Sequence, residues 1–422
     1  MTAFKPTNIL LPKETTDMSK WAVVACDQYT SEPDYWAKTE QIVGDAPSTL
    51  KITLPEIYLE QEGVEDRIKN IHASMADYLA KDVFAEYENA LVYIERTQDD
   101  GKVRAGIVGA IDLEMYDYRK GSKSQVRATE ATVVERIPPR IKVRQGAPIE
   151  LPHIMILIDD DMKTVVEPIA DAKNSLTKLY DFSLMQKGGE IKGWLLSEEL
   201  KENVLSALDK LSDLDSFNKK YDLNEDSVLL YAMGDGNHSL ATAKEFYEQL
   251  KAQNPGADLS NHPARYALVE IVNLHSPALE FEAIHRIVTE TDTEKLMNTL
   301  KEKLSLTAEG TEDMQSFMSV DNGVSTKWYV GNELSKLTVG SLQLVLDEYI
   351  KENGGKIDYI HGTEVIDSLS KNENSIGFVL PDMQKSELFP TVICDGALPR
   401  KTFSMGHAWD KRYYVEARKI TL

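Results

Sequence analysis

The stretch that decides the fold is "YAMGDGNHSLATA", residues 231–243. It overlaps "SVLLYAM", which has the short apolar run of a buried strand, and it leads into "SLATAKEFYEQL", whose apolar residues recur at helical spacing. The glycines therefore lie on a turn between a strand over 228–233 and a helix over 239–252. Such a turn presents free backbone N–H groups and the positive end of the helix dipole, which together favour an anion.

The turn carries polar side chains that a plain turn does not require. Its consecutive residues are Gly234, Asp235, Gly236, Asn237, His238 and Ser239. The glycines let a ligand approach the backbone closely, Asp235 can accept a proton or hold Mg²⁺, and His238 can donate to a phosphate oxygen or act as general acid. The alternative is a structural turn in which Asn237 or Ser239 caps the helix and His238 is an ordinary surface residue.

Net charge limits the anions that the protein can bind. The chain of 422 residues has a formal net charge of -22, which repels a nucleic-acid backbone or an anionic membrane, so we expect neither as a partner. A small anionic ligand needs a local excess of cations. Residues 119–144 supply it, since they hold two acids, Glu130 and Glu135, against these cations: Arg119, Lys120, Lys123, Arg127, Arg136, Arg140, Lys142 and Arg144. The alternative is a basic surface that balances acids elsewhere in the fold.

A second basic cluster lies near the C-terminus, in "LPRKTFSMGHAWDKRYYVEARKI", residues 398–420. Its cationic and imidazole side chains are Arg400, Lys401, His407, Lys411 and Arg412. This cluster can clamp an anionic ligand. A terminal strand pair with charged flanks explains it equally well.

The rest of the chain alternates strand and helix patterns. Strands are expected over 21–26, on both sides of an Asp100–Gly101 hairpin turn, in "HIMILIDD" and over 266–272 and 376–380, and helices near Pro33, from Val64 to Leu79 and over 196–212 and 293–304. This alternation predicts an α/β to α+β fold with mixed sheets and flanking helices. We expect an α/β core over residues 1–288 and a C-terminal α/β region packed on it over 289–422.

Two further features bear on location and metals. The sequence has no long uncharged apolar segment and no basic-then-apolar layout at its start, so a cytoplasmic protein is expected. Asp159, Asp160 and Asp161 follow the strand in "HIMILIDD" and form either a metal site or, more commonly for such a run, a solvated turn.

Several separated motifs resemble a bacterial family known as domain of unknown function 1015 (DUF1015). "GDGNHSLATA" is similar to its "DGHHR…A" strand-turn-helix, and "VACDQYTSEPDYW", "ATEAT" with "PPRIKVR", "IHRIV" and "PRKTFSMG" follow the expected order. This strand-turn-helix also resembles that of the ParB and sulfiredoxin superfamily. In that superfamily related turns bind nucleotide phosphates, and some members are kinases of free serine. The resemblance implies phosphoryl transfer from ATP, ADP or pyrophosphate to a small hydroxyl compound, with free L-serine as the leading acceptor.

The resemblance also implies roles for residues in the first part of the chain. Asp27 matches the acidic residue that ends the family's first strand, and Glu130 and Thr132 match its "HE-T" element. Arg140 and Arg144 match basic positions that follow this element.

In the second part of the chain, Asp235, Gly236 and His238 match the "DGHH" turn, and His285 with Arg286 matches a downstream "HR" pair. The sequence departs from the family pattern at Thr129, Ala131, Asn237 and Ser239, which stand where the family often has His, Arg, His and Arg. These departures remove cations from the expected nucleotide site. Either the donor differs, as pyrophosphate would, or the basic residues of 119–144 take their place.

The resulting hypothesis is an in-line phosphoryl transfer at the turn. Backbone N–H groups of residues 236–239, with Arg127, Arg140 and Arg144, neutralise the transferring group, and Arg400 and Lys401 add to substrate binding. One carboxylate, Asp27 or Asp235, accepts the hydroxyl proton and the other places Mg²⁺, and Glu130 and His238 are further candidates for catalysis. The alternatives are a hydrolase that uses the same site and a non-catalytic nucleotide-binding module; a homodimer is left open.

Overall fold

The computed structural model describes residues 2–132, 137–151 and 153–422, and the chain divides into two compact units. The first unit comprises residues 1–279 and 407–422, and the second comprises Glu280–Gly406. The sequence placed the division between 288 and 289 and gave the whole C-terminal part to the second region. The structure instead returns the last segment of the chain to the first unit.

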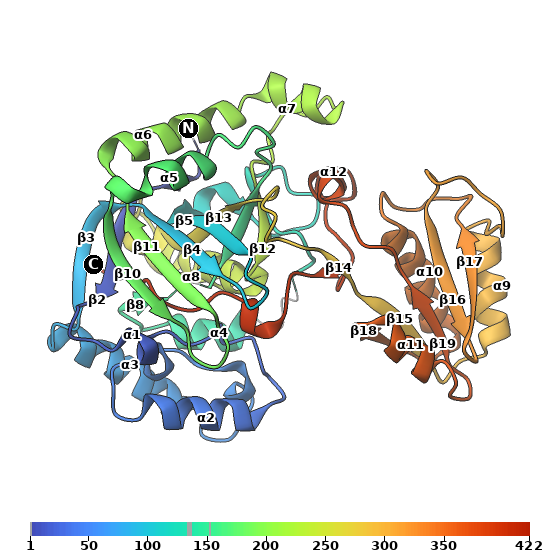
Figure 1. Ribbon diagram of the computed structural model, residues 1–422, viewed down its shortest axis with the longest axis horizontal. Coiled ribbons are helices and arrows are strands. Elements are labelled where there is room, and N and C mark those ends of the chain that lie inside the picture. Colours follow the sequence, from blue (N-terminus) through green and yellow to red (C-terminus); the bar gives the residue numbers. More distant parts are fainter. Residues whose placement is uncertain (1, 133–136, 152) are drawn as a thin grey trace. The chain divides into compact units, whose positions relative to one another are not determined.

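The first unit contains a mixed sheet with ten strands among the described residues (Figure 1). In spatial order its main path is β10 (Thr177–Ser183), β11 (Glu190–Leu195), β4 (Val92–Thr97), β5 (Val103–Asp112), β13 (Tyr266–Asn273), β9 (Met155–Ile158), β12 (Tyr231–Asp235), β7 (Val126–Arg127) and β6 (Tyr116–Asp117). The short strand β1 (Phe4–Lys5) pairs with β5. Two smaller sheets pair β2 (Thr7–Pro12) with β3 (Phe84–Ala90) and β8 (Ile149–Glu150) with β21 (Arg418–Lys419).

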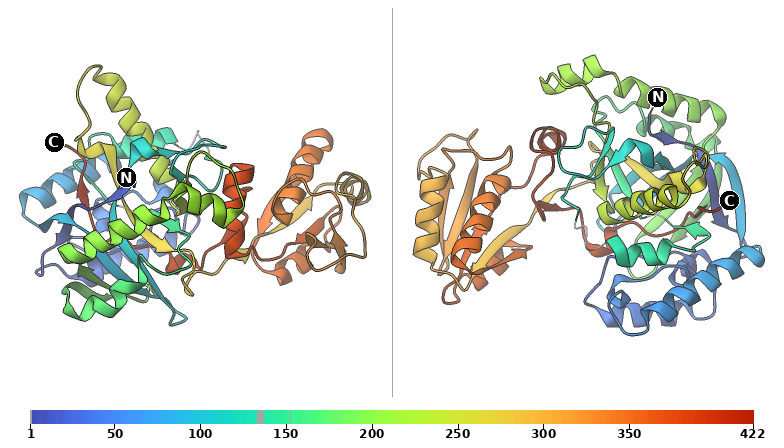
Figure 2. Two further views of the ribbon diagram at one scale, coloured as in Figure 1. Left: turned by 90° about the horizontal axis from the view of Figure 1, so that it is seen from above. Right: turned by 180° about the vertical axis from the view of Figure 1, so that it is seen from behind.

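Side chains of the large sheet alternate between two hydrophobic cores. On β4, Val92 and Ile94 pack in one core, which includes residues of α2 and α3, while Tyr93 packs in the other, with residues of α5, α6 and α8. Figure 1 shows α5 and α6 on one side of the sheet and α2 and α3 on the other. The view of the molecule from behind in Figure 2 shows α8 in front. The helices are α1 (Met18–Trp21), α2 (Pro33–Val43), α3 (Val64–Ala80), α4 (Ile137–Arg144), α5 (Glu167–Ala172), α6 (Glu198–Leu211), α7 (Leu214–Tyr221) and α8 (Asn237–Gln253).

The second unit has an antiparallel sheet and its own helices. The strand order is β17 (Val324–Tyr329), β16 (Ser316–Asp321), β19 (Ile376–Val379), β15 (His285–Thr289) and β18 (Lys356–Ile360). Its helices are α9 (Thr293–Lys303), α10 (Thr338–Asn353), α11 (Thr363–Leu369) and α12 (Lys385–Asp395), and β14 (Glu282–Ala283) pairs with β20 (Phe403–Ser404). The predicted mixed α/β to α+β architecture, with sheets flanked by helices, is confirmed.

Most of the predicted elements are found, but the strand expected over 21–26 is wrong. Trp21 ends helix α1, and the segment after it makes only an isolated bridge between Val24 and Tyr413. Backbone bonds of Tyr414 N to Val23 O and of Ala25 N to Arg412 O hold the segment against the C-terminal part of the chain. Its apolar residues are therefore buried by a distant segment and not by membership of a sheet.

The solvated turn that was the commoner expectation holds for Asp161, which lies in an exposed turn, but not for Asp159 and Asp160. Asp160 is fully buried and accepts hydrogen bonds from the backbone of Thr164 and Val165, so it fixes the turn that leads to α5. Asp159 pairs with Lys220 and His275. These carboxylates have structural partners.

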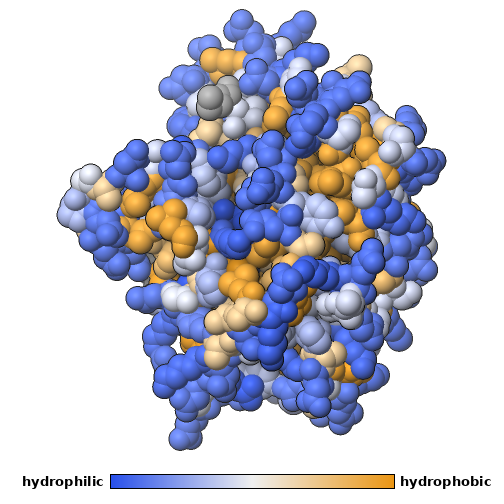
Figure 3. Space-filling model, turned by 90° about the vertical axis from the view of Figure 1, so that its left-hand side faces the viewer, coloured by the Kyte–Doolittle hydropathy of each residue, from blue (hydrophilic) through white to orange (hydrophobic). Residues whose placement is uncertain are grey.

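The surface agrees with the composition. One face of the molecule is mostly hydrophilic, with hydrophobic side chains gathered in separate areas (Figure 3). Among the helices that the structure describes, none combines the length and the apolar character that crossing a membrane requires.

Candidate functional site

The predicted strand-turn-helix is present, and Gly236 is its pivot. β12 ends at Asp235 and α8 begins at Asn237, with Gly236 as N-cap at φ 86°. A Cβ atom on Gly236 would lie 3.1 Å from Ile154 Cα, so both the backbone conformation and the space favour glycine. In the alternative weighed above, Asn237 or Ser239 capped the helix, but Gly236 occupies the cap position and no side chain caps it.

Asp235 lies at the end of β12 beside a lysine from the end of the chain. Its Oδ1 accepts a 2.9 Å hydrogen bond from Gly236 N, and its Oδ2 lies 3.5 Å from Lys411 Nζ. The Asp235 and Lys411 side chains are 22% and 18% exposed, so both are shielded from bulk solvent yet reachable. Shielding of this kind makes the attraction stronger than that of a surface pair.

Asp27 lies near the same lysine. Burial alone would raise the pKa of Asp27, but the charge of His153, a hydrogen bond from Gln28 and the charge of Lys411 together lower the pKa below the ordinary 3.8. The two carboxylates singled out from the sequence, Asp27 and Asp235, thus both interact with Lys411. Asp27 stays ionised at neutral pH.

A chain of hydrogen bonds connects α8 to the segment that holds Asp27. Ser239 Oγ lies 2.9 Å from His153 Nε2, and His153 Nδ1 lies 3.2 Å from the Tyr414 hydroxyl. The same hydroxyl accepts a bond from Cys26 N at 3.1 Å. His153 is buried and is held by a partner at each ring nitrogen, so its orientation is fixed. Neither His153 nor Tyr414 was among the residues predicted from the sequence.

A cavity of about 160 Å³ adjoins this chain and is lined by Cys26, His153, Ser239 and Tyr414 among others. The predicted residues Arg140 and Arg144 also line it, but each is paired with a glutamate of the wall. Arg140 Nε donates to Glu56 Oε1 at 2.9 Å, and Arg144 Nη2 lies 2.6 Å from Glu150 Oε2. Burial alone would raise the pKa of Glu150, but Arg144 and Arg418 lower it, so this carboxylate is ionised.

The "RATEAT" segment runs beside the turn. Ala232 of β12 lies opposite Arg127 of β7, and Thr129 Oγ1 donates to Met233 O at 2.8 Å, which lays residues 129–130 along the end of β12. Arg127 is buried and its Nε donates to Ser124 O, and its pKa is lowered chiefly by burial. Glu130 and Thr132 are half-buried.

The remaining cations of 119–144 mostly pair with acids elsewhere in the first unit. Arg119 pairs with Asp117, Lys123 with Glu225 and Lys142 with Glu65. Arg136 lies outside the described residues. These contacts favour the alternative in which much of this basic segment balances acids of the fold.

The structure separates the C-terminal basic cluster between the two units. Lys411 and Arg412 belong to the first unit, whereas Arg400 and Lys401 belong to the second, with Arg400 Nη2 lying 3.5 Å from Asp347 Oδ1. His285 and Arg286 also belong to the second unit. They therefore lie in a different unit from Asp235.

The buried pair on β15 serves the packing of the second unit. Arg286 is fully buried, and its guanidinium donates to Gln343 Oε1 at 3.0 Å and to the carbonyls of Lys401 and Arg400 at 2.9 and 3.0 Å. His285 Nδ1 accepts from Leu380 N at 3.3 Å, and its pKa is lowered chiefly by burial. Substrate contact by either residue stays a prediction.

In the comparison with protein families, residues 4–388 match a family described as proteins of unknown function, DUF1015. The chain belongs to the DUF1015 family. The resemblance noted from the separated motifs is thereby confirmed. Comparison with curated proteins finds no match.

Solved structures similar to this DUF1015 chain share little sequence with it. A conserved hypothetical protein from Pyrococcus furiosus is 12% identical, with 74% of this chain and 94% of that chain covered and a TM-score of 0.35. A free serine kinase variant in complex with AMP is 12% identical, with 76% and 92% covered and a TM-score of 0.39. SbnI with a C-terminal truncation, from Staphylococcus aureus, is 9% identical, with 71% and 82% covered and a TM-score of 0.34.

Proposed function

We propose that the first unit is a phosphotransferase that moves a phosphoryl group from a nucleotide or pyrophosphate to the hydroxyl of a small compound. The observation that carries this proposal is that Asp27 and Asp235 both interact with Lys411 at the N-terminus of α8. Carboxylates and a cation beside a helix N-terminus are the groups that phosphoryl transfer needs, because it depends mainly on positioning and on charge stabilisation.

In this proposal the donor phosphate binds at the start of α8. The backbone N–H groups of Asn237 and His238 and the ammonium of Lys411 face the developing negative charge, and the helix dipole adds to their attraction. Gly236 allows the helix to start directly at the end of β12, because its φ of 86° and the nearness of Ile154 leave no room for a side chain there. Arg127, Arg140 and Arg144 remain predicted contributors, and Glu56 and Glu150 compete for the latter two.

Asp27 is the proton acceptor of the proposed reaction. Its carboxylate is ionised at neutral pH and lies near His153, whose partner Ser239 is in the first turn of α8. The acceptor oxygen forms a bond to phosphorus, its proton passes to Asp27, and the bond from phosphorus to the donor's bridging oxygen breaks with its electron pair. Asp27 rather than Asp235 takes this role because it follows the cavity-lining Cys26 and feels the charge of His153, which also lines the cavity.

The residues present fit a magnesium ion that arrives with the donor phosphates. Mg²⁺ in such sites binds one or two carboxylates together with phosphate oxygens, and it would neutralise phosphate charge there. Asp235 offers a partly exposed carboxylate oxygen for it. No group of three or more metal-binding side chains occurs in the described ranges, so a metal bound by the protein alone is not proposed.

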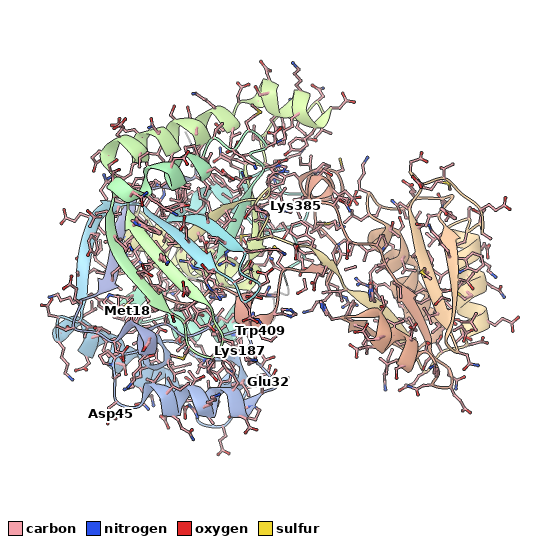
Figure 4. All side chains as sticks on the ribbon, viewed as in Figure 1. Met18, Glu32, Asp45, Lys187, Lys385 and Trp409 are labelled. Atoms are coloured by element: carbon pink, nitrogen blue, oxygen red, sulfur yellow. The ribbon has the colours of Figure 1, made fainter. Side chains whose placement is uncertain are left out.

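The acceptor that the family resemblance implies is free L-serine, and ATP, ADP and pyrophosphate are the candidate donors. The test is phosphoryl transfer with Mg²⁺ by the protein and by its Asp27→Asn and Asp235→Asn variants. We expect kcat to fall by about a hundredfold or more in each variant. Asp45→Asn is the matched control, because Asp45 is an exposed aspartate after α2 (Figure 4).

Three results would contradict the proposal. Normal turnover in both site variants would exclude the mechanism. Release of free phosphate without any acceptor would indicate a hydrolase at the same site. Ligand-dependent stabilisation without donor consumption would indicate a non-catalytic binding module.

A further inference from the structure

The cavity next to Ser239 is apolar over most of its wall. Hydrophobic side chains reach it from α3, α4, β8 and β13 and from the segments between them, among them Leu54, Met75, Val143, Ala147 and Leu268. Four of these five side chains are buried, and Val143 packs against the same core. A cavity of about 160 Å³ with such a wall gains binding energy from an apolar group that displaces water.

The charged residues of the wall are already engaged with one another. Arg140 is paired with Glu56, and Arg144 is paired with Glu150, which Arg418 Nε also contacts at 2.9 Å. An ammonium or carboxylate group of a ligand would have to break one of these shielded ion pairs, which is costly. The wall is therefore poorly suited to the charged groups of a ligand and is suited to its apolar part.

One polar part of the cavity lies where the proposed reaction takes place. Ser239 and His153 line it, 2.9 Å apart, and the Tyr414 hydroxyl stands behind His153. Asp27 is next in sequence to the lining residue Cys26 and is close enough to His153 for that charge to lower its pKa. A bound molecule would thus place its polar end near Asp27 and the N-terminus of α8.

We propose that this cavity holds the aliphatic part of the acceptor, so that the preferred acceptor is an alcohol with a short apolar chain rather than free serine. The inference rests on the proposed function, since it assigns the acceptor of that reaction. It divides the site into a polar region for the donor and the reacting hydroxyl and an apolar region that selects the acceptor. A β-hydroxy amino acid with a longer side chain meets both requirements.

The experiment measures binding and transfer over one homologous series. L-Serine, L-threonine, β-hydroxynorvaline and β-hydroxyleucine share one polar head and differ in the length and branching of the apolar chain. Calorimetric titration of the full chain without donor gives their dissociation constants, and phosphoryl transfer is then measured for each with ATP, ADP and pyrophosphate. We expect the dissociation constant to fall about fourfold for each added carbon until the cavity is filled.

A substitution in the cavity separates this effect from general hydrophobic binding. Ala147→Leu places extra carbon atoms in the cavity, and the gain for the longest acceptors should be lost. Ala207→Leu is the matched control, because Ala207 lies on α6 and packs in the other core. It should leave the series unchanged.

The outcomes distinguish the two proposals. Equal affinities along the series, tightest binding of L-serine, or no binding of any member would overturn the acceptor assignment. If serine is then phosphorylated, the phosphotransferase proposal stands. Affinities that rise with chain length and respond to Ala147→Leu support the cavity assignment. If no donor is consumed in that case, the phosphotransferase proposal fails, while the assignment of the cavity to an apolar group stands.

Discussion

Lys411 connects the two aspartates of the site, and its charge helps to decide when Asp27 is ionised. The ammonium lies 3.5 Å from Asp235 Oδ2, and its charge also lowers the pKa of Asp27. His153 acts on Asp27 in the same direction. The ionised state of the proposed proton acceptor is therefore set by residues from three separate parts of the chain.

This arrangement predicts the acid side of the pH profile. The pKa of Asp27 is lowered from 3.8, so its carboxylate persists below the range of an ordinary aspartate, and kcat should fall only when the pH drops through that lowered value. In Lys411→Met the pKa of Asp27 should rise and the acid limb should move to higher pH. Measurement of kcat against pH for both proteins tests this, with exposed Lys187→Met as control (Figure 4).

The same shift has a consequence for stability. Because the folded pKa of Asp27 lies below its unfolded value, its contribution to the free energy of unfolding is present above about pH 4 and is lost as the pH falls through the folded value. Lys411→Met should reduce this contribution at neutral pH. An acid limb that does not move in Lys411→Met would contradict the proximity of the two residues.

At the residue scale the sequence indicated only part of the site. Asp27, Asp235 and Ser239 were found because they lie in or beside motifs with local structure. His153 lies just before the buried strand β9 and belongs to no motif. Its position beside a buried strand is the one signal that could have indicated it. Lys411 was seen only as one member of a basic cluster, because ion pairs across about 180 residues leave no trace in spacing.

At the scale of elements, the turn from β12 to α8 is the most constrained part of the site. Gly236 needs a positive φ of 86° and has Ile154 close behind it. The positive φ and the close contact arise because α8 starts directly at the end of β12, which lies between β9 and β7 in the sheet.

Substitution of this glycine should cost stability in two parts. Gly236→Ala puts a side chain in the left-handed region, at about 1–2 kcal/mol, and adds a 3.1 Å contact with Ile154 Cα. Gly256→Ala is the matched control, because Gly256 also has φ 86° but nothing lies within 4 Å of its added Cβ. Urea unfolding should show a larger loss for Gly236→Ala; equal losses would mean that Ile154 yields without cost.

The sequence predicted elements well where the signal was local. The strand-turn-helix, the β4–β5 hairpin and helices α3, α6 and α9 follow from periodicity and turn residues within one segment. The run at 21–26 failed because a strand and a buried extended segment share the same apolar pattern. In the structure Trp21 belongs to α1, and the residues after it make only the isolated bridge between Val24 and Tyr413.

For the whole molecule, the return of residues 407–422 to the first unit is the feature that completes the site. Arg96 fastens this segment: it is buried, and its guanidinium donates to Trp409 O at 2.8 Å, to Lys411 O at 2.9 Å and, from Nε, to Gly188 O at 2.9 Å. Figure 4 labels Trp409 and, next in sequence to Gly188, Lys187, on the two segments that Arg96 joins. A positioning role for Arg96 follows, through the backbone of Lys411.

Removal of Arg96 should therefore weaken the fold and displace Lys411. Arg96→Met leaves several buried carbonyls without their donor, and we expect a loss of about 2–5 kcal/mol in the free energy of unfolding by urea. Surviving protein at low temperature should show an acid limb moved toward that of Lys411→Met. Arg119→Met, at an exposed arginine, should change little; a similar effect of both variants would contradict the assigned role.

The sequence could not predict this organisation at the largest scale. Composition indicated a folded, acidic protein, and the alternation of elements indicated its class. The division between residues 279 and 280 and the return at 407 have no linker composition to mark them. Both are decided by which distant apolar surfaces and buried ions pair with one another.

The most direct test of the central claim is a phosphorus NMR assay of the purified protein with Mg²⁺, in which ATP, ADP and pyrophosphate are each combined with L-serine and with the longer β-hydroxy amino acids. The account predicts a new phosphomonoester signal with at least one donor, formed only when an acceptor is present and absent in Asp27→Asn. Donor signals that stay unchanged in every combination, or that decay to free phosphate alone, would contradict it.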